Sequence, residues 1–172
     1  MFPQRISLKP AHWYVLDEVD VAAAVTRHAA LRSLCAITER MADALPARSC
    51  PTVLAATAHR LRSFADAPDT MDALLVRLVS GRAEPAAVIA RRLSREWHTL
   101  DTAHAHDLAD VLIGWAGGQG TPAVDVLAYI LRCFFEGCRR TIAFREMAVV
   151  TFGADRLTLA AAESLRTSLA RA

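Results

Sequence analysis

Residues 117–151 read "GGQGTPAVDVLAYILRCFFEGCRRTIAFREMAVVT", and this stretch decides the fold class. A glycine-rich break is followed by Thr121 and Pro122, residue types that favour the N-cap and the first turn of a helix. Apolar residues then recur at three- or four-residue spacing, at Val124, Leu127, Leu131, Phe134 and Cys138. This spacing predicts a long amphipathic helix over about 122–151.

Breaks rich in proline or glycine divide the rest of the chain in the same way, at "PARSCP" (46–51), "SGRAEP" (80–85) and "FGAD" (152–155). Together the breaks bound four long segments and one short one, at about 18–45, 52–80, 85–116, 122–151 and 158–170. Because the connections are short, successive helices are expected to be antiparallel neighbours. The sequence therefore predicts an all-α, up-down four-helix bundle with a short fifth C-terminal helix.

Composition sets the class of protein. A length of 172 residues predicts a single domain over 1–172, with an N-terminal arm over 1–17. The net charge of +2 gives no electrostatic reason for a nucleic-acid partner, and no apolar run approaches the roughly 20 residues that span a bilayer. The four cysteines form no CxxC pair. We therefore expect a cytoplasmic protein with reduced thiols, which contacts neither nucleic acid nor membrane.

Polar residues interrupt the predicted core stripes. In the third segment the stripe runs through Ile89, Leu93, Trp97, Leu100, His104, Leu108, Val111 and Trp115. The residues that are unexpected at core positions are His28, Pro68, Asp72, Trp97, Thr141 and Arg145. Polar groups in a core must be paired, and cofactor sites of helical bundles are built between facing helices. These positions are the candidate centre of the protein.

Four stretches that contain these positions share a pattern with one protein family. They are "HAALR" (28–32), "FADAPDTMDALL" (64–75), "RLSREWHTLD" (92–101) and "RRTIAFREMAVVTFGADRLTLAAAESLRTSLARA" (139–172). The last resembles a family pattern of the form RRHxAFEExxxxP followed by LTxxDLxxL. In order and helical placement, the four stretches resemble bacterial hemerythrin-like domains over about residues 18–170. That resemblance implies a four-helix bundle in which inward histidines and carboxylates hold two iron ions that bind or sense oxygen or nitric oxide, or serve iron storage and repair.

The ligand positions implied by the resemblance are mostly substituted. His28 and Glu146 match family ligands. The other ligand positions carry Pro68 or at best Asp69, Asp72 near the expected glutamate, Trp97, Thr141 and Arg145. Trp offers no lone pair to a metal, Thr is a poor iron ligand, and Arg brings a fixed positive charge. We therefore expect no metal or other cofactor, an Arg145–Asp72 ion pair in the place of the metal, and Trp97 filling the vacated volume.

Two functions follow from this interpretation. The first is a non-enzymatic binding or interaction protein with a degenerate, metal-free site and a protein or small-molecule partner. The alternative is a metal-binding protein, with two irons or one metal, that senses oxygen, nitric oxide or redox state or handles iron. Its ligands would be His28, Asp72, Glu146 and Asp101.

Other features carry less information. The histidine-rich stretch "EWHTLDTAHAHD" (96–107) is expected to place His98 and His106 at the surface and His104 at the core or its boundary. No nucleophile motif such as Gly-x-Ser-x-Gly is present. In the N-terminal arm, Trp13, Tyr14 and Leu16 are expected either to cover one end of the core or to form the contact of a homodimer.

Overall fold

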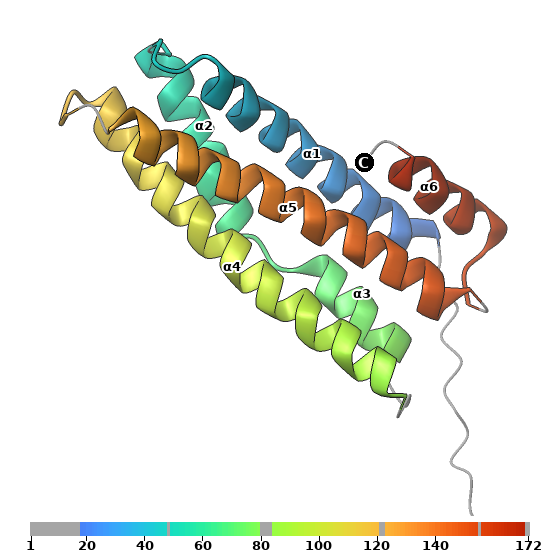
Figure 1. The fold of residues 1–172 in the computed structure, drawn as a ribbon. Helices are drawn as coiled ribbons and strands as arrows, with labels where there is room; N and C mark the ends of the chain where they lie inside the picture. Colours follow the sequence, from blue (N-terminus) through green and yellow to red (C-terminus); the bar gives the residue numbers. More distant parts are fainter. Residues whose placement is uncertain (1–17, 48, 80–83, 121–122, 155, 171–172) are drawn as a thin grey trace, which may run out of the picture.

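The computed structural model describes residues 18–47, 49–79, 84–120, 123–154 and 156–170, and these are all-helical apart from their connections (Figure 1). The predicted contacts of Trp13, Tyr14 and Leu16 lie outside the described residues. The helices are α1 (Glu18–Asp43), α2 (Pro51–Asp66), α3 (Thr70–Val79), α4 (Pro85–Ala116), α5 (Val124–Gly153) and α6 (Leu159–Leu169). None of these helices is long and apolar enough to cross a bilayer.

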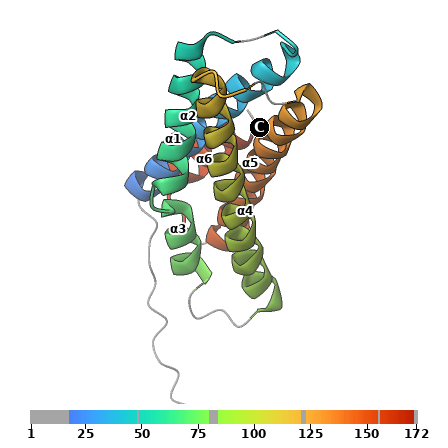
Figure 2. The ribbon, with the colours of Figure 1, turned by 90° about the vertical axis from the view of Figure 1, so that its left-hand side faces the viewer.

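The helices pack in a small number of pairs. α1 packs mainly against α5, α2 against α4, and α4 against α5. The short helix α3 continues along α4 beyond the end of α2, where it also contacts α5 (Figure 2). α6 lies against α1 and α5 (Figure 1). The polar positions of α1, α4, α5 and α6 are thereby brought to one level of the structure.

The prediction of one helix over 52–80 is wrong, because the chain breaks after Asp66. Ala67 has an extended conformation, with φ −78° and ψ 144°. Pro68 explains this conformation, since proline disfavours the helical state in the residue before it and cannot donate a backbone hydrogen bond. A new helix starts at Thr70, and Asp69 caps it by accepting a hydrogen bond from the Asp72 N–H at 3.1 Å.

Two hydrophobic clusters form the core. The first joins α1, α2, α4 and α5 and includes Leu31, Leu54, Leu61, Leu108 and Phe134. The second joins α3, α6 and the facing ends of α1, α4 and α5, and includes Val21, Met71, Leu75, Val149 and Leu165. The stripes predicted for the first and fourth long segments are largely confirmed, although Val124 is 40% exposed.

The stripe predicted for α4 is wrong in its first half. Ile89 and Leu100 are 55% and 52% exposed. The residues that face the core there are small or polar: Ala87, Ala90, Ser94, Asp101 and Ala105. Small side chains let neighbouring helices approach closely, and they leave the buried face of this half of the helix with few large apolar residues. The pattern of large apolar residues therefore gives the wrong rotation for α4.

Candidate functional site

Buried polar side chains lie between the two hydrophobic clusters and form what we call the polar layer. On α1 and α4, they follow the residues of one cluster and precede those of the other. Nearly all have 4% or less of their surface exposed, and Asp69 is somewhat more open. The members of the polar layer are His28, Asp69, Ser94, Asp101, Thr141, Arg145, Glu146 and Ser168.

The centre of the polar layer is an ion pair between Arg145 of α5 and Asp69. The Arg145 guanidinium donates to both carboxylate oxygens, at 3.0 and 2.6 Å. It also donates to Ser94 Oγ at 2.9 Å and to the Ser94 carbonyl at 3.0 Å. Burial raises the pKa of Asp69, but the charge and hydrogen bonds of Arg145 outweigh it, so the pKa is lowered overall. The cation is therefore fully paired inside the protein.

The predicted pairing of Arg145 with Asp72 is wrong. Asp72 instead lies 3.5 Å from Arg95, whose side chain is 59% exposed. The Oδ1 atom of Asp72 is buried and has no hydrogen-bond partner. The helix break at Pro68 explains the exchange, because it moves Asp69 off a regular helix and leaves its carboxylate free to turn toward α5. Asp72, at the start of α3, then takes the outer position.

Glu146 holds a second set of contacts, at the junction of α1, α5 and α6. His28 Nδ1 lies 2.7 Å from Oε1, Ser168 Oγ donates to the same oxygen at 2.8 Å, and Arg32 donates to Oε2 at 2.9 Å. Arg32 also donates to Ser168 Oγ at 2.9 Å. Burial raises the Glu146 pKa, but these hydrogen bonds more than offset it and lower the pKa overall. Glu146 is therefore an ionised carboxylate that joins three helices.

A small cavity opens inside the polar layer, with room of about 20 Å³. It is lined by His28, His98, Asp101, Thr141 and Arg145, among others. The Thr141 hydroxyl is buried at this cavity. The volume and the polar lining suit one water molecule. The Asp101 carboxylate packs closely on Gly137 of α5, where a Cβ atom would lie 2.8 Å from Oδ1.

Asp101 is a member of the polar layer whose negative charge is poorly compensated. Burial raises its pKa, and Thr141 and nearby cations only partly offset this effect. A raised carboxyl pKa favours folding below the unfolded value, 3.8, and this contribution is lost as pH rises through the folded value.

We therefore expect Asp101→Asn to raise the free energy of unfolding at pH 7 by about 0.5–1 kcal/mol, since it removes a poorly compensated buried charge. Urea unfolding of both proteins from pH 7 to pH 4 measures the effect. The gain should shrink as the pH falls. A large loss of stability at pH 7 would show that the ionised carboxylate is needed.

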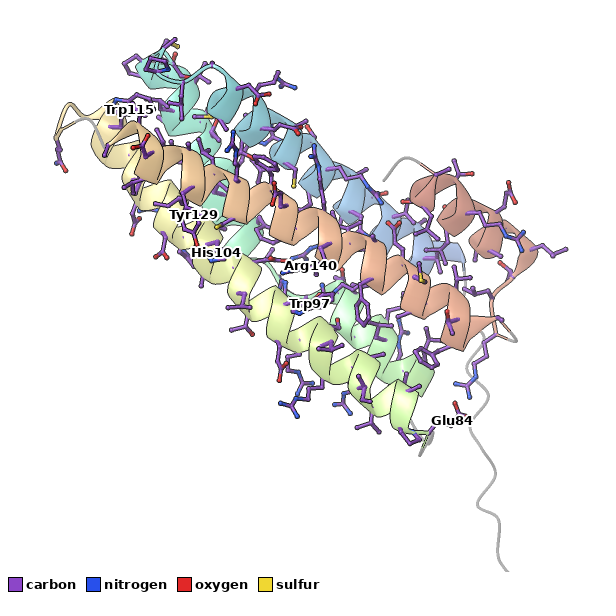
Figure 3. All side chains as sticks on the ribbon, viewed as in Figure 1. Glu84, Trp97, His104, Trp115, Tyr129 and Arg140 are labelled. Atoms are coloured by element: carbon purple, nitrogen blue, oxygen red, sulfur yellow. The ribbon has the colours of Figure 1, made fainter. Side chains whose placement is uncertain are left out.

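The predictions that Trp97 fills the centre of the site and that His98 lies at the surface are both wrong. His98 is largely buried, faces the cavity, and places Nε2 3.5 Å from Asp69 Oδ2. Burial is the main cause that lowers its pKa. Trp97 instead lies beside Phe144, with ring centroids 4.9 Å apart, and the Arg140 guanidinium covers its ring at 4.8 Å (Figure 3). Trp97 therefore seals the outer side of the α4–α5 contact and does not fill the centre.

The remaining histidines of this stretch are closer to expectation. The side chain of His106 is 49% exposed and lies 3.6 Å from Asp66. His104 is half-buried on α4 and lies on the face of α4 and α5 seen in Figure 3. Neither contributes to the polar layer.

The four candidate metal ligands do not converge. His28 and Glu146 bind each other, Asp101 faces the cavity, and Asp72 lies toward Arg95. Within the described part of the chain, no three His, Cys, Asp or Glu side chains are placed to hold a metal ion. The Arg145 guanidinium, which donates into the middle of the layer, would be repelled by iron there. The residues present do not fit the di-iron centre that the family resemblance implies.

Comparison with known proteins gives no relative, since no family model, curated protein or solved structure matches the chain. The resemblance to hemerythrin-like domains stays a prediction from the sequence.

Proposed function

We propose that this chain is a hemerythrin-like, up-down four-helix bundle whose metal centre has been replaced by side-chain ion pairs, and that it acts by binding a partner and not by catalysis. The proposal rests on the polar layer, which contains His28, Asp69, Thr141, Arg145 and Glu146, residues at or beside the positions that the resemblance assigns to metal ligands.

One observation carries the proposal: the Arg145 guanidinium is buried, 5% exposed, and makes four hydrogen bonds to Asp69 and Ser94. An unpaired buried charge costs several kcal/mol, so this geometry is stable only because the carboxylate is present. The positive charge of Arg145 compensates the negative charge of the Asp69 carboxylate, as a bound metal cation would.

The contacts of the layer also support a role that is not catalytic. His28 and Glu146 are bound to each other, and Glu146 is further held by Arg32 and Ser168. A general base needs a free lone pair within reach of a substrate proton. Here the carboxylate lone pairs hold α1, α5 and α6 together. The buried thiol of Cys138 has a raised pKa, caused by its contact with Cys35 and by burial, which opposes thiolate chemistry.

The test is the metal content of the protein after expression in iron-rich medium, measured together with its visible spectrum. We expect no stoichiometric iron and no oxo-bridge absorption band. Two irons per chain would overturn the proposal and favour the metal-binding alternative. Sedimentation velocity on the same sample measures whether the chain is a homodimer, which the sequence leaves open.

A further inference from the structure

A groove runs along the surface between α1 and α2, which make fewer contacts with each other than α1 makes with α5. Its volume is about 300 Å³. Leu31 and Leu34 of α1 and Phe64 of α2 give it an apolar floor. The Phe64 ring lies edge-on to His98 and to Phe134, with centroids 6.1 and 6.2 Å apart. These contacts hold the Phe64 ring in place in the floor of the groove.

Two arginines line the groove, Arg27 and Arg60, and no acidic residue lines it among the described residues. Arg60 has a neutral neighbour, Ser33 Oγ, at 3.4 Å. Arg27 donates to the carbonyls of Pro68 and Ala67. Carbonyl and hydroxyl oxygens satisfy hydrogen bonds but leave the positive charge uncompensated.

Asp69 does not fully neutralise the charge of Arg27. Asp69 interacts electrostatically with Arg27, but its two oxygens are bound by Arg145. Two guanidinium groups therefore share one carboxylate at this end of the groove. The positive potential at this end adds to that of Arg60 and favours an anionic ligand in the groove.

The arginines stand near opposite ends of the apolar floor. Arg60 reaches Ser33, which is six residues along α1 from Arg27 and therefore about 9 Å away along the helix axis. A ligand that lies on Leu31 and Leu34 thus has a cation within reach of either end.

We propose that this groove binds a small amphipathic carboxylate, with its anionic group at Arg60 and its apolar body on Leu31, Leu34 and Phe64. The inference rests on the proposed function, because it names the ligand class of a binding protein. It goes beyond that function in placing the site outside the polar layer, between α1 and α2.

Titration calorimetry of the 172-residue chain with sodium octanoate tests the proposal. We expect one site per chain with a Kd on the order of 1 mM, as suits a ligand of this size in a half-open groove. Octanol and octyltrimethylammonium carry the same apolar body without the negative charge. Both should bind at least about threefold more weakly.

Three variants locate the site. Arg60→Gln should weaken octanoate binding about three- to fivefold, since it removes one exposed charge. Arg62→Gln is the matched control, because Arg62 pairs with Asp110 and does not line the groove. It should bind like the wild type. Ser63→Trp places a large ring on an exposed groove position and should abolish binding without changing the melting temperature.

Equal affinity for octanoate and octanol, or equal affinity of Arg60→Gln and the wild type, would overturn the inference. So would a dimer in sedimentation that leaves octanoate unbound, since a second copy would then cover the groove. A metal-free protein that does not bind octanoate disproves only the groove ligand. A protein that holds two irons and binds octanoate disproves only the metal-free centre.

Discussion

Replacing Asp69 with asparagine is expected to lower the free energy of unfolding by about 3 kcal/mol, because it leaves the Arg145 guanidinium buried without its counter-charge. Asparagine keeps the size of the side chain and caps a helix as well as aspartate does. The loss therefore reports on the ion pair and not on the start of α3. Chemical denaturation of both proteins at pH 7 gives the difference.

Two further variants complete this experiment. Asp72→Asn is the matched control, three residues away, and should cost under about 1 kcal/mol, since its partner Arg95 is largely exposed. The double variant Asp69→Asn/Arg145→Met should recover most of the stability, since it removes both charges from the interior. A loss below about 1 kcal/mol for Asp69→Asn would mean that the pair is solvated.

Glu146→Gln is expected to cost about 2–3 kcal/mol at pH 7, because Glu146 is fully buried and accepts from His28, Arg32 and Ser168. The glutamine amide group can replace only one of the two acceptor oxygens. Glu39→Gln gives the comparison on an exposed pair, since Glu39 binds Arg139 with both oxygens at the surface. Its loss should be clearly smaller.

The pH dependence of this difference has a definite sign. The pKa of Glu146 is lowered in the folded state, so its contribution is present above the unfolded value, 4.5, and is lost as pH falls through the folded value. The gap in stability between the wild type and Glu146→Gln should therefore be constant near neutral pH and shrink below pH 4.5. A gap that widens in acid would contradict the assignment of an ionised Glu146.

Much of the helical framework is predictable from punctuation in the sequence. The segment predicted over 85–116 matches α4, because Pro85 marks its start and Gly117 its end. Pro68 also indicates that the segment 52–80 divides into two helices. The apolar stripe on both sides of the proline nevertheless suggests one continuous helix.

The centre of the site is harder to predict. Arg145 is buried as expected, but its partner is Asp69 and not Asp72. These two aspartates are less than one helical turn apart in the sequence. Which of them reaches Arg145 depends on the path of the chain through the break at Pro68. The burial of His98 is hard to predict for another reason. The small residues on the inner face of α4 carry little hydrophobic signal, and the large apolar side chains of its outer face set the predicted rotation instead.

The most direct measurement of the central claim is the free energy of unfolding of the metal-free protein, determined with excess chelator and again with excess Fe²⁺ under anaerobic conditions. A polar layer completed by Arg145, Asp69 and Glu146 predicts that the two values agree, because a ligand that does not bind the folded state adds no stability. A ligand that binds only the folded state adds about 2.7 kcal/mol at a hundredfold excess over its Kd. A rise of that size with Fe²⁺ would contradict the account.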